Sequence, residues 1–507
     1  MKTVYDFLDR LAYHPNYKFT SGLKDIRRIP IVPIIIIGIL GFLTIQLIVE
    51  YFSLNVWRHD AFIHTPEQSW YFASVKETGR WIIYYLFDVV KLLPPAICAT
   101  INLICLFAFG FLITRSIQKD YYISAIIGFL FILPPVLHAQ NLWPQTSLSA
   151  FILLPLMFYL SRRVHPYVFF PIAAVLFFGT LSNYYFLMPL VYLGYMYDNL
   201  KGEWKHDVIF TFIKILLPYV LAFVVGYLIT NGITYLVTGQ TIVLGEWRGP
   251  KTITDFDSFL VNFDSVNQRI WKFLSSVKSE YSLVVVVAAF IMFLLGTSKK
   301  IFWTLLVVIV VFLSPFYTTI YHGIFISNRS LTTSFVVVLI PFVLLSIRQV
   351  KFNNLHALLC LAVAYPLYTS SKGHLNLFSH AVNYCYEEVR VAMEDFPPSS
   401  YPDVVIFAED KEVGKIERQI MNRLDQRFEW CESLGNSRRL VIPQLRALGY
   451  RNIYTASKEQ MQAVEEQAQK RSPVTNTFLP IRFDNNANLI GLRLNDSELK
   501  EYVFIEL

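Results

Sequence analysis

One stretch near the N-terminus concentrates residues that can do acid–base chemistry. The segment WRHDAFIHTPEQSWYFASVKETGRW places Asp60 between two histidines and ends on Arg80 and Trp81. A carboxylate fixed just above a lipid surface can act as general base on a hydroxyl group, and its pKa need not be far from normal for that role. Asp60 is therefore the first candidate for a catalytic base. The alternative is a solvated loop aspartate that pairs with Arg58 or with a backbone amide.

Arginines in other polar segments supply the second half of a plausible site. They are Arg80 in TGRW, Arg248 in GEWRGP and Arg329 in SNRS. A guanidinium group matches phosphate oxygens bidentately and stabilises a leaving phosphate as charge develops. The three arginines together favour a phosphate site, although any one of them alone is more typical of a structural residue. Other candidates for substrate contact are Trp143, Asn141, Glu246, Trp247 and His322.

Several chemistries lack their signatures in this sequence. It contains no Walker lysine loop, no HExxH and no CxxC pair, which excludes ATP-driven transport, zinc proteolysis and thiol redox chemistry of those types. A gradient-driven transporter is expected to carry ionisable residues at mid-membrane depth, and most apolar runs here contain none. We therefore expect a reaction or binding site in the loops, with no cofactor and no metal ion.

The composition indicates a membrane protein. The chain is 54% hydrophobic and 16% charged with a mean hydropathy of +0.44, whereas soluble domains carry about 25% charged residues. The 42 Phe and 30 Tyr suit lipid contact and interfacial belts, and they are also able to hold a sugar. The net charge of +7 does not indicate nucleic-acid binding, because the basic residues gather in short loops, where such residues set membrane topology.

The apolar runs predict about eleven transmembrane helices. They cover residues 29–52, 92–114, 121–137, 146–160, 167–181, 184–197, 208–237, 282–296, 301–318, 331–347 and 355–369. Basic residues fall in alternate connections, which are therefore predicted to be cytoplasmic. These residues are Lys24, Arg27, Arg28, Arg115, Lys119, Arg162, Arg163, Lys201, Lys205, Lys299, Lys300, Arg348 and Lys351. An odd number of spans then leaves the N-terminus in the cytoplasm and the C-terminus on the far side.

Two long outer loops, 53–91 and 238–281, are each expected to contain a helix on the membrane surface. Within 255–278 the apolar residues recur at helical spacing, with polar residues on the other faces. The stretch 69–87 is a weaker version of the same pattern, for which a packing helix without chemistry is an equal alternative.

After residue 370 the composition changes. Residues 371–507 are predicted to form a soluble α/β domain, with strands at 404–407 and 452–455 and helices at 413–427 and 458–470. Cys385 and Cys431 lie in this polar region and are able to form a disulfide in an oxidising compartment.

With these features in place, the chain resembles a known family. An acidic residue in the first outer loop (HDAF), then ETGRW leading into the next span, about eleven spans and a soluble C-terminal tail are similar to the serotype-converting O-antigen glucosyltransferases. These are phage-borne polytopic enzymes of Gram-negative bacteria. The resemblance covers the whole chain in layout, while its local motif is short.

The resemblance implies a GT-C-like membrane glycosyltransferase at residues 1–370 that takes glucose from undecaprenyl phosphate. It would make Asp60 the base that deprotonates an O-antigen hydroxyl, with Glu67 and Glu77 as secondary acidic candidates. Residues expected to bind substrate are His59, Arg80, Trp81, Trp143, Glu246, Arg248, His322 and Arg329. Relatives carry a paired acidic motif where this chain has His59 and Asp60, so no metal site is implied here.

The resemblance also implies partners and a location. The partners are the lipid-linked sugar, the lipopolysaccharide acceptor, membrane lipid, and the donor-making transferase and flippase of the same pathway. The expected location is the bacterial inner membrane with the C-terminal domain in the periplasm. Two other interpretations stay open: another envelope enzyme that uses lipid-linked sugars, such as an O-antigen polymerase, and a non-enzymatic flippase or transporter.

Overall fold

The computed structural model describes most of the membrane region and parts of the C-terminal region. The described residues are 31–54, 57, 68–118, 120–244, 250–276, 280–295, 299–324, 328–346, 353–392, 394, 397–399, 403–407, 445–450, 452–455, 489–496 and 499–506. The chain divides into two compact units, which are described separately. One comprises Met1–Tyr51 and Glu67–Lys372, and the other comprises Phe52–Pro66 and Gly373–Leu507.

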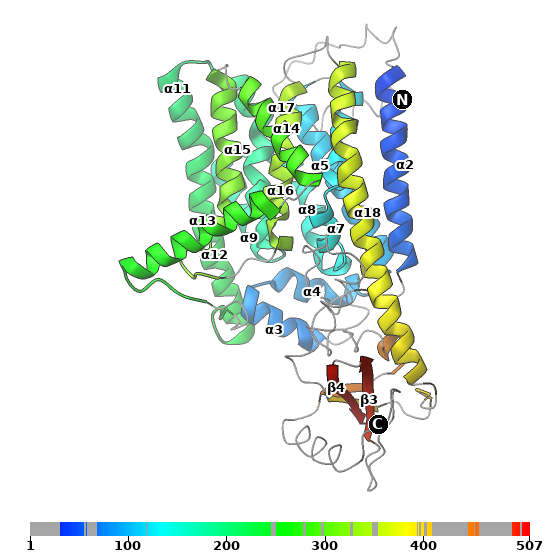
Figure 1. The fold of residues 1–507 in the computed structure, drawn as a ribbon. Coiled ribbons are helices and arrows are strands. Elements are labelled where there is room, and N and C mark those ends of the chain that lie inside the picture. The colour runs from blue at the N-terminus through cyan, green and yellow to red at the C-terminus, as the bar shows by residue number, and fades with distance from the viewer. Residues whose placement is uncertain are drawn as a thin grey trace. The chain divides into compact units, whose positions relative to one another are not determined.

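The first unit is built of helices (Figure 1). In chain order they are α2 (Ile31–Ser53), α3 (Gln68–Thr78), α4 (Trp81–Val90), α5 (Pro95–Ile117), α6 (Tyr121–Ile132), α7 (Pro135–Gln140), α8 (Pro144–Ser161), α9 (Pro166–Phe178), η2 (Ser182–Tyr192), α10 (Leu193–Asn199), α11 (Trp204–Ile209), η3 (Phe210–Leu216), α12 (Leu217–Thr238), α13 (Phe256–Ser276), α14 (Glu280–Leu295), α15 (Lys299–Tyr317), η5 (Asn328–Leu331), α16 (Thr332–Val338), α17 (Ile340–Leu345) and α18 (Asn353–Ala392).

Local sequence signals explain where many of these helices begin and end. Four of them, α5, α7, α8 and α9, start on a proline, whose fixed φ suits the first helical position and whose missing N–H is not needed there. Asp120 caps α6 by accepting hydrogen bonds from the N–H groups of Tyr122 and Ile123. Gly239 ends α12 with a φ of 75°.

The structure is that of an α-helical membrane protein. Among the described residues, five helical stretches are long and apolar enough to cross a membrane: Ile31–Ser53, Pro95–Ile117, Pro144–Ser161, Trp204–Thr238 and Lys299–Tyr317. Every apolar run that the sequence predicts as a span contains a helix. The number of crossings stays a prediction, because several of the other apolar helices are shorter than a bilayer is thick.

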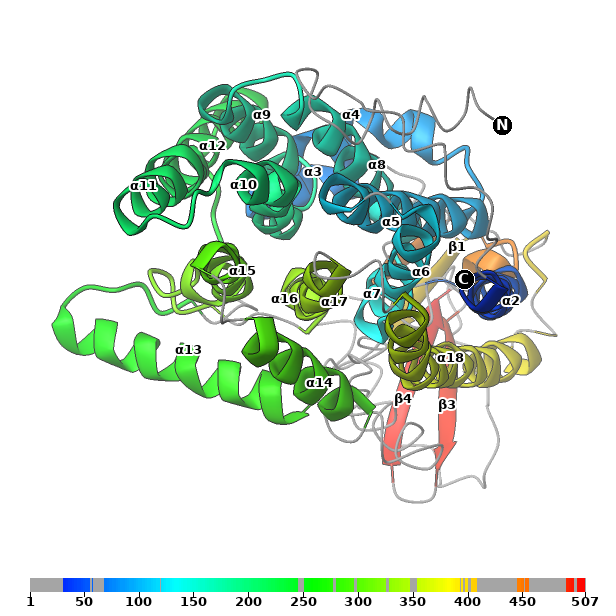
Figure 2. The ribbon, with the colours of Figure 1, turned by 90° about the horizontal axis from the view of Figure 1, so that it is seen from above.

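Small residues let the long helices pack closely. The helix α5 packs on α6 and α8, and α9 packs on α12, as the view along the bundle shows (Figure 2). A Cβ added at Gly110 would lie 2.6 Å from the ring of Phe131, and one at Gly226 would lie 2.6 Å from Ala174 Cβ. Such close approach is typical of helix pairs in membranes, where packing replaces the hydrophobic effect as the driving force.

The helices α3, α4 and α13 of this unit lie across the bundle rather than along it (Figure 1). The helix predicted within 255–278 is confirmed as α13. The prediction of a single helix over 69–87 is wrong, because the helix is interrupted at Gly79 and Arg80 and forms two helices, α3 and α4. Gly79 has a φ of 70°, a left-handed conformation that an α-helix cannot contain.

Two stretches of the first unit, η2 and η3, are helical but not α-helical. The segment η2 is a 3-10 helix of 11 residues, although such helices rarely exceed 3–4 residues. The segment η3 is a π-helix of 7 residues that continues directly into Pro218 of α12. The N–H of Leu217 bonds to the carbonyl of Phe212, so the next donor in that pattern would be residue 218, which is proline and has none. The carbonyl of Ile213 instead accepts a hydrogen bond of 2.8 Å from the Tyr167 hydroxyl.

A buried polar network joins α2, α5, α7 and α8. The Tyr51 hydroxyl lies 2.5 Å from His138 Nδ1, and His138 Nε2 lies 2.9 Å from the carbonyl oxygen of Ile132. Since that carbonyl only accepts, Nε2 carries the proton and Nδ1 accepts from Tyr51. Asn102 donates to Asn141 Oδ1 at 2.8 Å, and Asn141 donates to the carbonyl of Ala99 at 3.1 Å. These side chains are almost fully buried, so each bond replaces one that water would otherwise make.

The second unit contains a four-stranded sheet. Its strands are β1 (Asp403–Phe407), β2 (Asn452–Thr455), β3 (Leu489–Asp496) and β4 (Leu499–Glu506), in the order β2-β1-β4-β3. The pair β1 and β2 is parallel, with Val404 opposite Ile453, whereas β4 is antiparallel to both β1 and β3. The strands predicted at 404–407 and 452–455 coincide with β1 and β2. The helices predicted at 413–427 and 458–470 lie outside the described residues, so the α/β domain stays a prediction.

The helix α18 runs without a break past the predicted end of the last span. The sequence places that end at residue 369, and the helix continues to Ala392. Near this point Lys372 Nζ lies 3.8 Å from Glu50 Oε1 at the end of α2, and the Tyr368 hydroxyl bonds to Gln46. A change of composition therefore did not end the helix, because polar residues continue a helix as readily as apolar ones do.

We expect Tyr51→Phe to destabilise the protein by about 1–3 kcal/mol, because it leaves the buried His138 Nδ1 without its donor. Tyr365→Phe is the matched control, since Tyr365 is 64% exposed on α18. Thermal unfolding of both variants in the same detergent measures the effect. Equal melting temperatures for the two variants would contradict a role of the network in stability.

Candidate functional site

The ETGRW motif forms a sharp corner between α3 and α4. The Gly79 N–H donates to the carbonyl of Val75, and the Gly79 carbonyl accepts from the N–H of Trp81, both at 2.9 Å. A Cβ at position 79 would lie 2.6 Å from Thr230 Cγ2 and 2.8 Å from Ile242 Cδ1. The motif therefore needs glycine for two reasons: its left-handed φ, and the close approach of α12 and of the chain that follows it.

This corner is joined to the segment that follows α12, which belongs to the predicted outer loop 238–281. The N–H of Val243 donates to the carbonyl of Lys76 at 3.0 Å, and the N–H of Ile242 donates to Asn231 Oδ1 at 3.1 Å. Lys76 precedes Glu77 directly, and Val243 lies just before the GEWRGP segment in the sequence. The structure thus brings together the two loops in which the sequence predicts acidic and cationic residues.

Trp81 is held on the other side of the corner by α9. The N–H of Ile82 donates to the carbonyl of Gly179 at 2.9 Å, and a Cβ at Gly179 would lie 2.8 Å from Trp81 Cε2. The indole N–H of Trp81 is buried and makes no hydrogen bond to any described residue. Glu77 and Arg80 are both half-buried, on either side of Gly79. The corner therefore combines a carboxylate, a guanidinium and an aromatic ring, which suits a ligand with anionic and sugar-like parts.

His322 lies in a second loop, after α15. Its carbonyl accepts from the N–H of Lys251 at 2.7 Å, and the carbonyl of Tyr321 accepts from Ile253 at 3.0 Å. Its ring is half-buried and packs edge-on against Tyr321 at a centroid distance of 4.7 Å. Partial burial lowers the pKa of His322, because desolvation favours the neutral imidazole over the charged form. A neutral imidazole can donate or accept a hydrogen bond.

The amphipathic helix α13 is fixed to this loop by polar side chains. Asn262 donates to the carbonyls of Lys251 and Ile320, at 2.7 and 3.0 Å, and Arg269 donates to the carbonyl of Ile324 at 2.7 Å. A second face of the helix leaves Phe256, Leu260, Phe263 and Trp271 exposed. Exposed apolar residues beside a polar face are typical of a helix in a membrane interface.

The start of α13 is closed by a reciprocal cap. Asp255 Oδ1 accepts from the N–H of Ser258 at 2.7 Å, while Ser258 Oγ accepts from the N–H of Asp255 at 3.0 Å. The backbone and side-chain hydrogen bonds from Ser258 hold the pKa of Asp255 below its usual value. Asp255 therefore acts in helix capping, which fixes where the loop ends and the surface helix begins.

The segment η5 contains the backbone of Arg329 and packs against α7. The neighbouring residues Asn141 and Trp143 are 1% and 3% exposed, so both are enclosed by the protein. Asn141 belongs to the polar network that holds α7. The network therefore also supports η5.

Several predicted site residues lie outside what the structure describes. They are His59, Asp60, Glu67, Glu246, Arg248 and Cys431, together with the side chains of Arg329 and Cys385. Of the predicted residues, Glu77, Arg80 and Trp81 share one corner, while Trp143 and His322 lie on other elements.

Tyr51, His138 and Asn102, which are central to the polar network, were not among the residues predicted from the sequence. Asn102 gave a signal, because it interrupts the apolar run 92–114, where a polar side chain needs a partner. His138 lies just after the run 121–137, in a predicted connection. The partners were not predictable: Tyr51 and His138 are 87 residues apart, and Asn102 and Asn141 are 39 apart.

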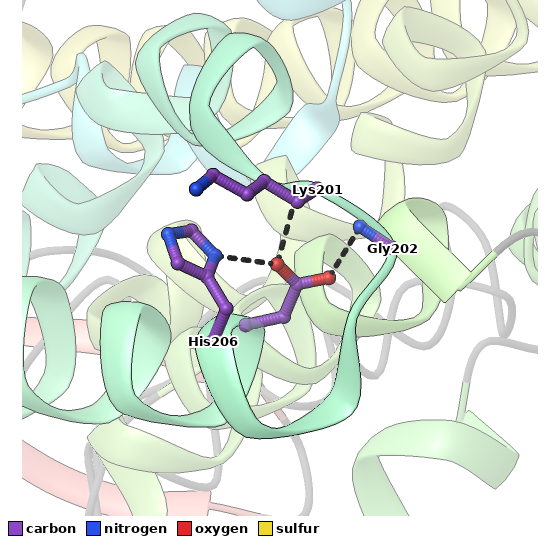
Figure 3. A network of polar contacts seen from close by, with 4 residues as sticks. Lys201, Gly202 and His206 are labelled. Atoms are coloured by element: carbon purple, nitrogen blue, oxygen red, sulfur yellow. Dashed lines mark hydrogen bonds and ion pairs between the residues drawn. The ribbon is translucent and has the colours of Figure 1, made fainter.

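The most saturated carboxylate of the described residues is structural. Asp207 is fully buried near the start of α11 and accepts from the N–H groups of Lys201 and Gly202, at 2.9 and 2.8 Å, and from His206 Nδ1 at 3.0 Å (Figure 3). All three donors belong to the turn and the first turn of the helix, so the group fixes the connection between α10 and α11. A carboxylate surrounded in this way has no accessible lone pair for chemistry.

Comparison of the chain with known family models, with curated proteins and with solved structures gave no match. What the structure defines by itself is the class: an α-helical, multi-pass membrane protein.

Gly79→Ala should impair both folding and function. Gly239→Ala is a close control, because Gly239 also has a positive φ (75°) but a Cβ there would meet nothing within 4 Å. Each substitution adds about 1–3 kcal/mol of backbone strain. Only Gly79→Ala also collides with Thr230 and Ile242, so its melting temperature in detergent is expected to be the lower of the two. Identical melting temperatures would show that the close approach at the corner is unimportant.

Proposed function

We propose that this chain is a glycosyltransferase that uses a sugar carried on polyprenyl phosphate. In its most specific form, it transfers glucose from undecaprenyl phosphate to a sugar of the O-antigen repeat at the periplasmic face of the inner membrane. The proposal includes a GT-C-like architecture with about eleven spans and a soluble C-terminal domain. It rests on the resemblance of HDAF and ETGRW to the serotype-converting glucosyltransferases.

One structural observation carries the proposal furthest: the hydrogen bond of Val243 to Lys76, at 3.0 Å. It joins the ETGRW corner to the chain that enters GEWRGP. A transferase of this type needs a base near the acceptor and cations near the leaving phosphate, and these were predicted in two loops far apart in sequence. The joint supports the view that the ETGRW corner, with Glu77 and Arg80, and the chain that enters GEWRGP serve one site.

The chemistry is a single in-line displacement. The acceptor hydroxyl oxygen attacks the anomeric carbon, the bond from that carbon to the phosphate oxygen breaks, and polyprenyl phosphate leaves with the electron pair. Asp60 takes the hydroxyl proton, while Arg80, Arg248 and Arg329 balance the charge that develops on the phosphate. Because one displacement inverts configuration, a β-linked donor gives an α-linked product. No nucleotide and no metal ion is required in this scheme.

Asp60→Asn should reduce glucose transfer from purified undecaprenyl-phosphate glucose by at least about 100-fold, since general-base catalysis typically contributes 10²–10⁴. Asp257→Asn is the control, because Asp257 is an exposed carboxylate on α13. Both variants should melt at the wild-type temperature. Transfer at the wild-type rate by a folded Asp60→Asn variant would rule out this residue as the base.

The proposed topology has its own test. Alkaline phosphatase fused after Leu507 should be active, because an odd number of spans places the C-terminus in the periplasm, where this enzyme forms its disulfides. The same fusion after Lys201 should be inactive, since this residue lies in a predicted cytoplasmic connection. The reverse pattern would overturn the orientation, and two active fusions would overturn the span count.

A further inference from the structure

Cations gather at the end of the first unit where α8 and α10 end and α11 and α15 begin. The electrostatic interactions of Asp198 with Arg162 and Lys300 place these three elements together, and Lys300 Nζ lies 5.7 Å from the centre of the Tyr197 ring. The same end carries four exposed basic residues, which are Arg163, Lys201, Lys205 and Lys299. Within the described part of the chain, none of these four forms an ion pair.

Most carboxylates at this end already interact with other groups of the protein. Asp207 is enclosed by its three donors, and Asp120 caps α6. Asp198 interacts with Arg162 and Lys300 at once. Among the described residues of these connections, this leaves Glu203 as the one carboxylate without such a role. The surface therefore carries an excess of positive charge that the protein does not neutralise.

Aromatic and aliphatic side chains continue from these cations along α11 and η3. Trp204 is 63% exposed, and its ring lies 4.9 Å from Trp303 and 6.4 Å from Phe302. Further along, Ile209 is 58% exposed and Phe212 is 46% exposed. This surface thus combines exposed lysines, an exposed indole and exposed apolar side chains, the kinds of group that suit the phosphate, the ester groups and the acyl chains of a phospholipid.

We propose that this surface, formed by Lys201, Lys205, Lys299, Lys300 and Trp204, binds an anionic phospholipid. The lysines contact the phosphate, the indole lies at the level of the ester groups, and an acyl chain runs along Ile209 and Phe212. The start of α15 at Lys299 adds the positive end of a helix dipole to the same place. This site is separate from the ETGRW corner and does not depend on the proposed transferase activity.

Titration of the purified protein with phosphatidylglycerol and with phosphatidylcholine, followed by native mass spectrometry, tests the site. We expect the wild type to prefer phosphatidylglycerol, and Lys205→Gln/Lys299→Gln to weaken its binding roughly ten- to thirtyfold, because each lysine near an anionic headgroup contributes about a factor of five. Lys205→Arg/Lys299→Arg should restore the preference. Lys91→Gln/Lys251→Gln, which removes exposed lysines at α4 and before α13, should leave it unchanged.

Four outcomes would overturn the proposal. One is a wild type that binds both lipids equally, and another is an unchanged preference in Lys205→Gln/Lys299→Gln. The third is an equal loss in Lys91→Gln/Lys251→Gln, which would mean that net charge rather than this surface governs binding. Added inorganic phosphate at millimolar concentration should compete weakly, and complete displacement of the lipid by it would show that the surface recognises the free anion instead. All variants replace exposed side chains, and their melting temperatures check that they are folded.

Discussion

The arrangement of the first unit depends on the buried contact between Tyr51 and His138. A polar side chain in the middle of an apolar bundle is costly unless each of its donors and acceptors has a partner. His138 meets this requirement with Tyr51 on one nitrogen and the Ile132 carbonyl on the other. The two bonds fix α7 relative to α2 and to the end of α6. Asn141, at the other end of α7, then joins Asn102 of α5 by the same principle.

Some of the connections between the helices are positioned by this arrangement. The segment η5 packs on α7, and the loop between α4 and α5 is tied to α8 by Gln145, whose side chain donates to the Leu93 carbonyl at 2.8 Å. The ETGRW corner is instead supported by α9 and α12, through Gly179 and Thr230. Short surface helices are marginal by themselves, so their geometry must come from the helices below them. The bundle thus fixes the described part of the candidate site through backbone hydrogen bonds and close contacts.

The sequence predicted most of the helices but not the contacts between segments that lie far apart in the chain. Helices over the apolar runs followed from composition, because a backbone in lipid must satisfy its own hydrogen bonds. The helix α13 followed from its periodicity. The corner at Gly79 was not predicted, since the apolar spacing over 69–87 continues through it and only the contacts with Thr230 and Ile242 show why a break is needed. The hydrogen bond from Val243 to Lys76 was not predictable either, because it joins backbone groups of segments far apart in sequence.

The irregular helices give the aromatic composition a role beyond lipid contact. The π-helical η3 followed by Pro218 leaves the Ile213 carbonyl without its helical donor, and Tyr167 supplies one. Tyr185, from the long 3-10 helix η2, donates to the Tyr219 carbonyl at 2.6 Å, one residue beyond that proline. Inside a membrane no water is available for such carbonyls, so a nearby hydroxyl on a rigid ring is an effective substitute. Some of the tyrosines in this chain therefore have a structural role: the Tyr167 hydroxyl completes the hydrogen bonding of a π-helical segment.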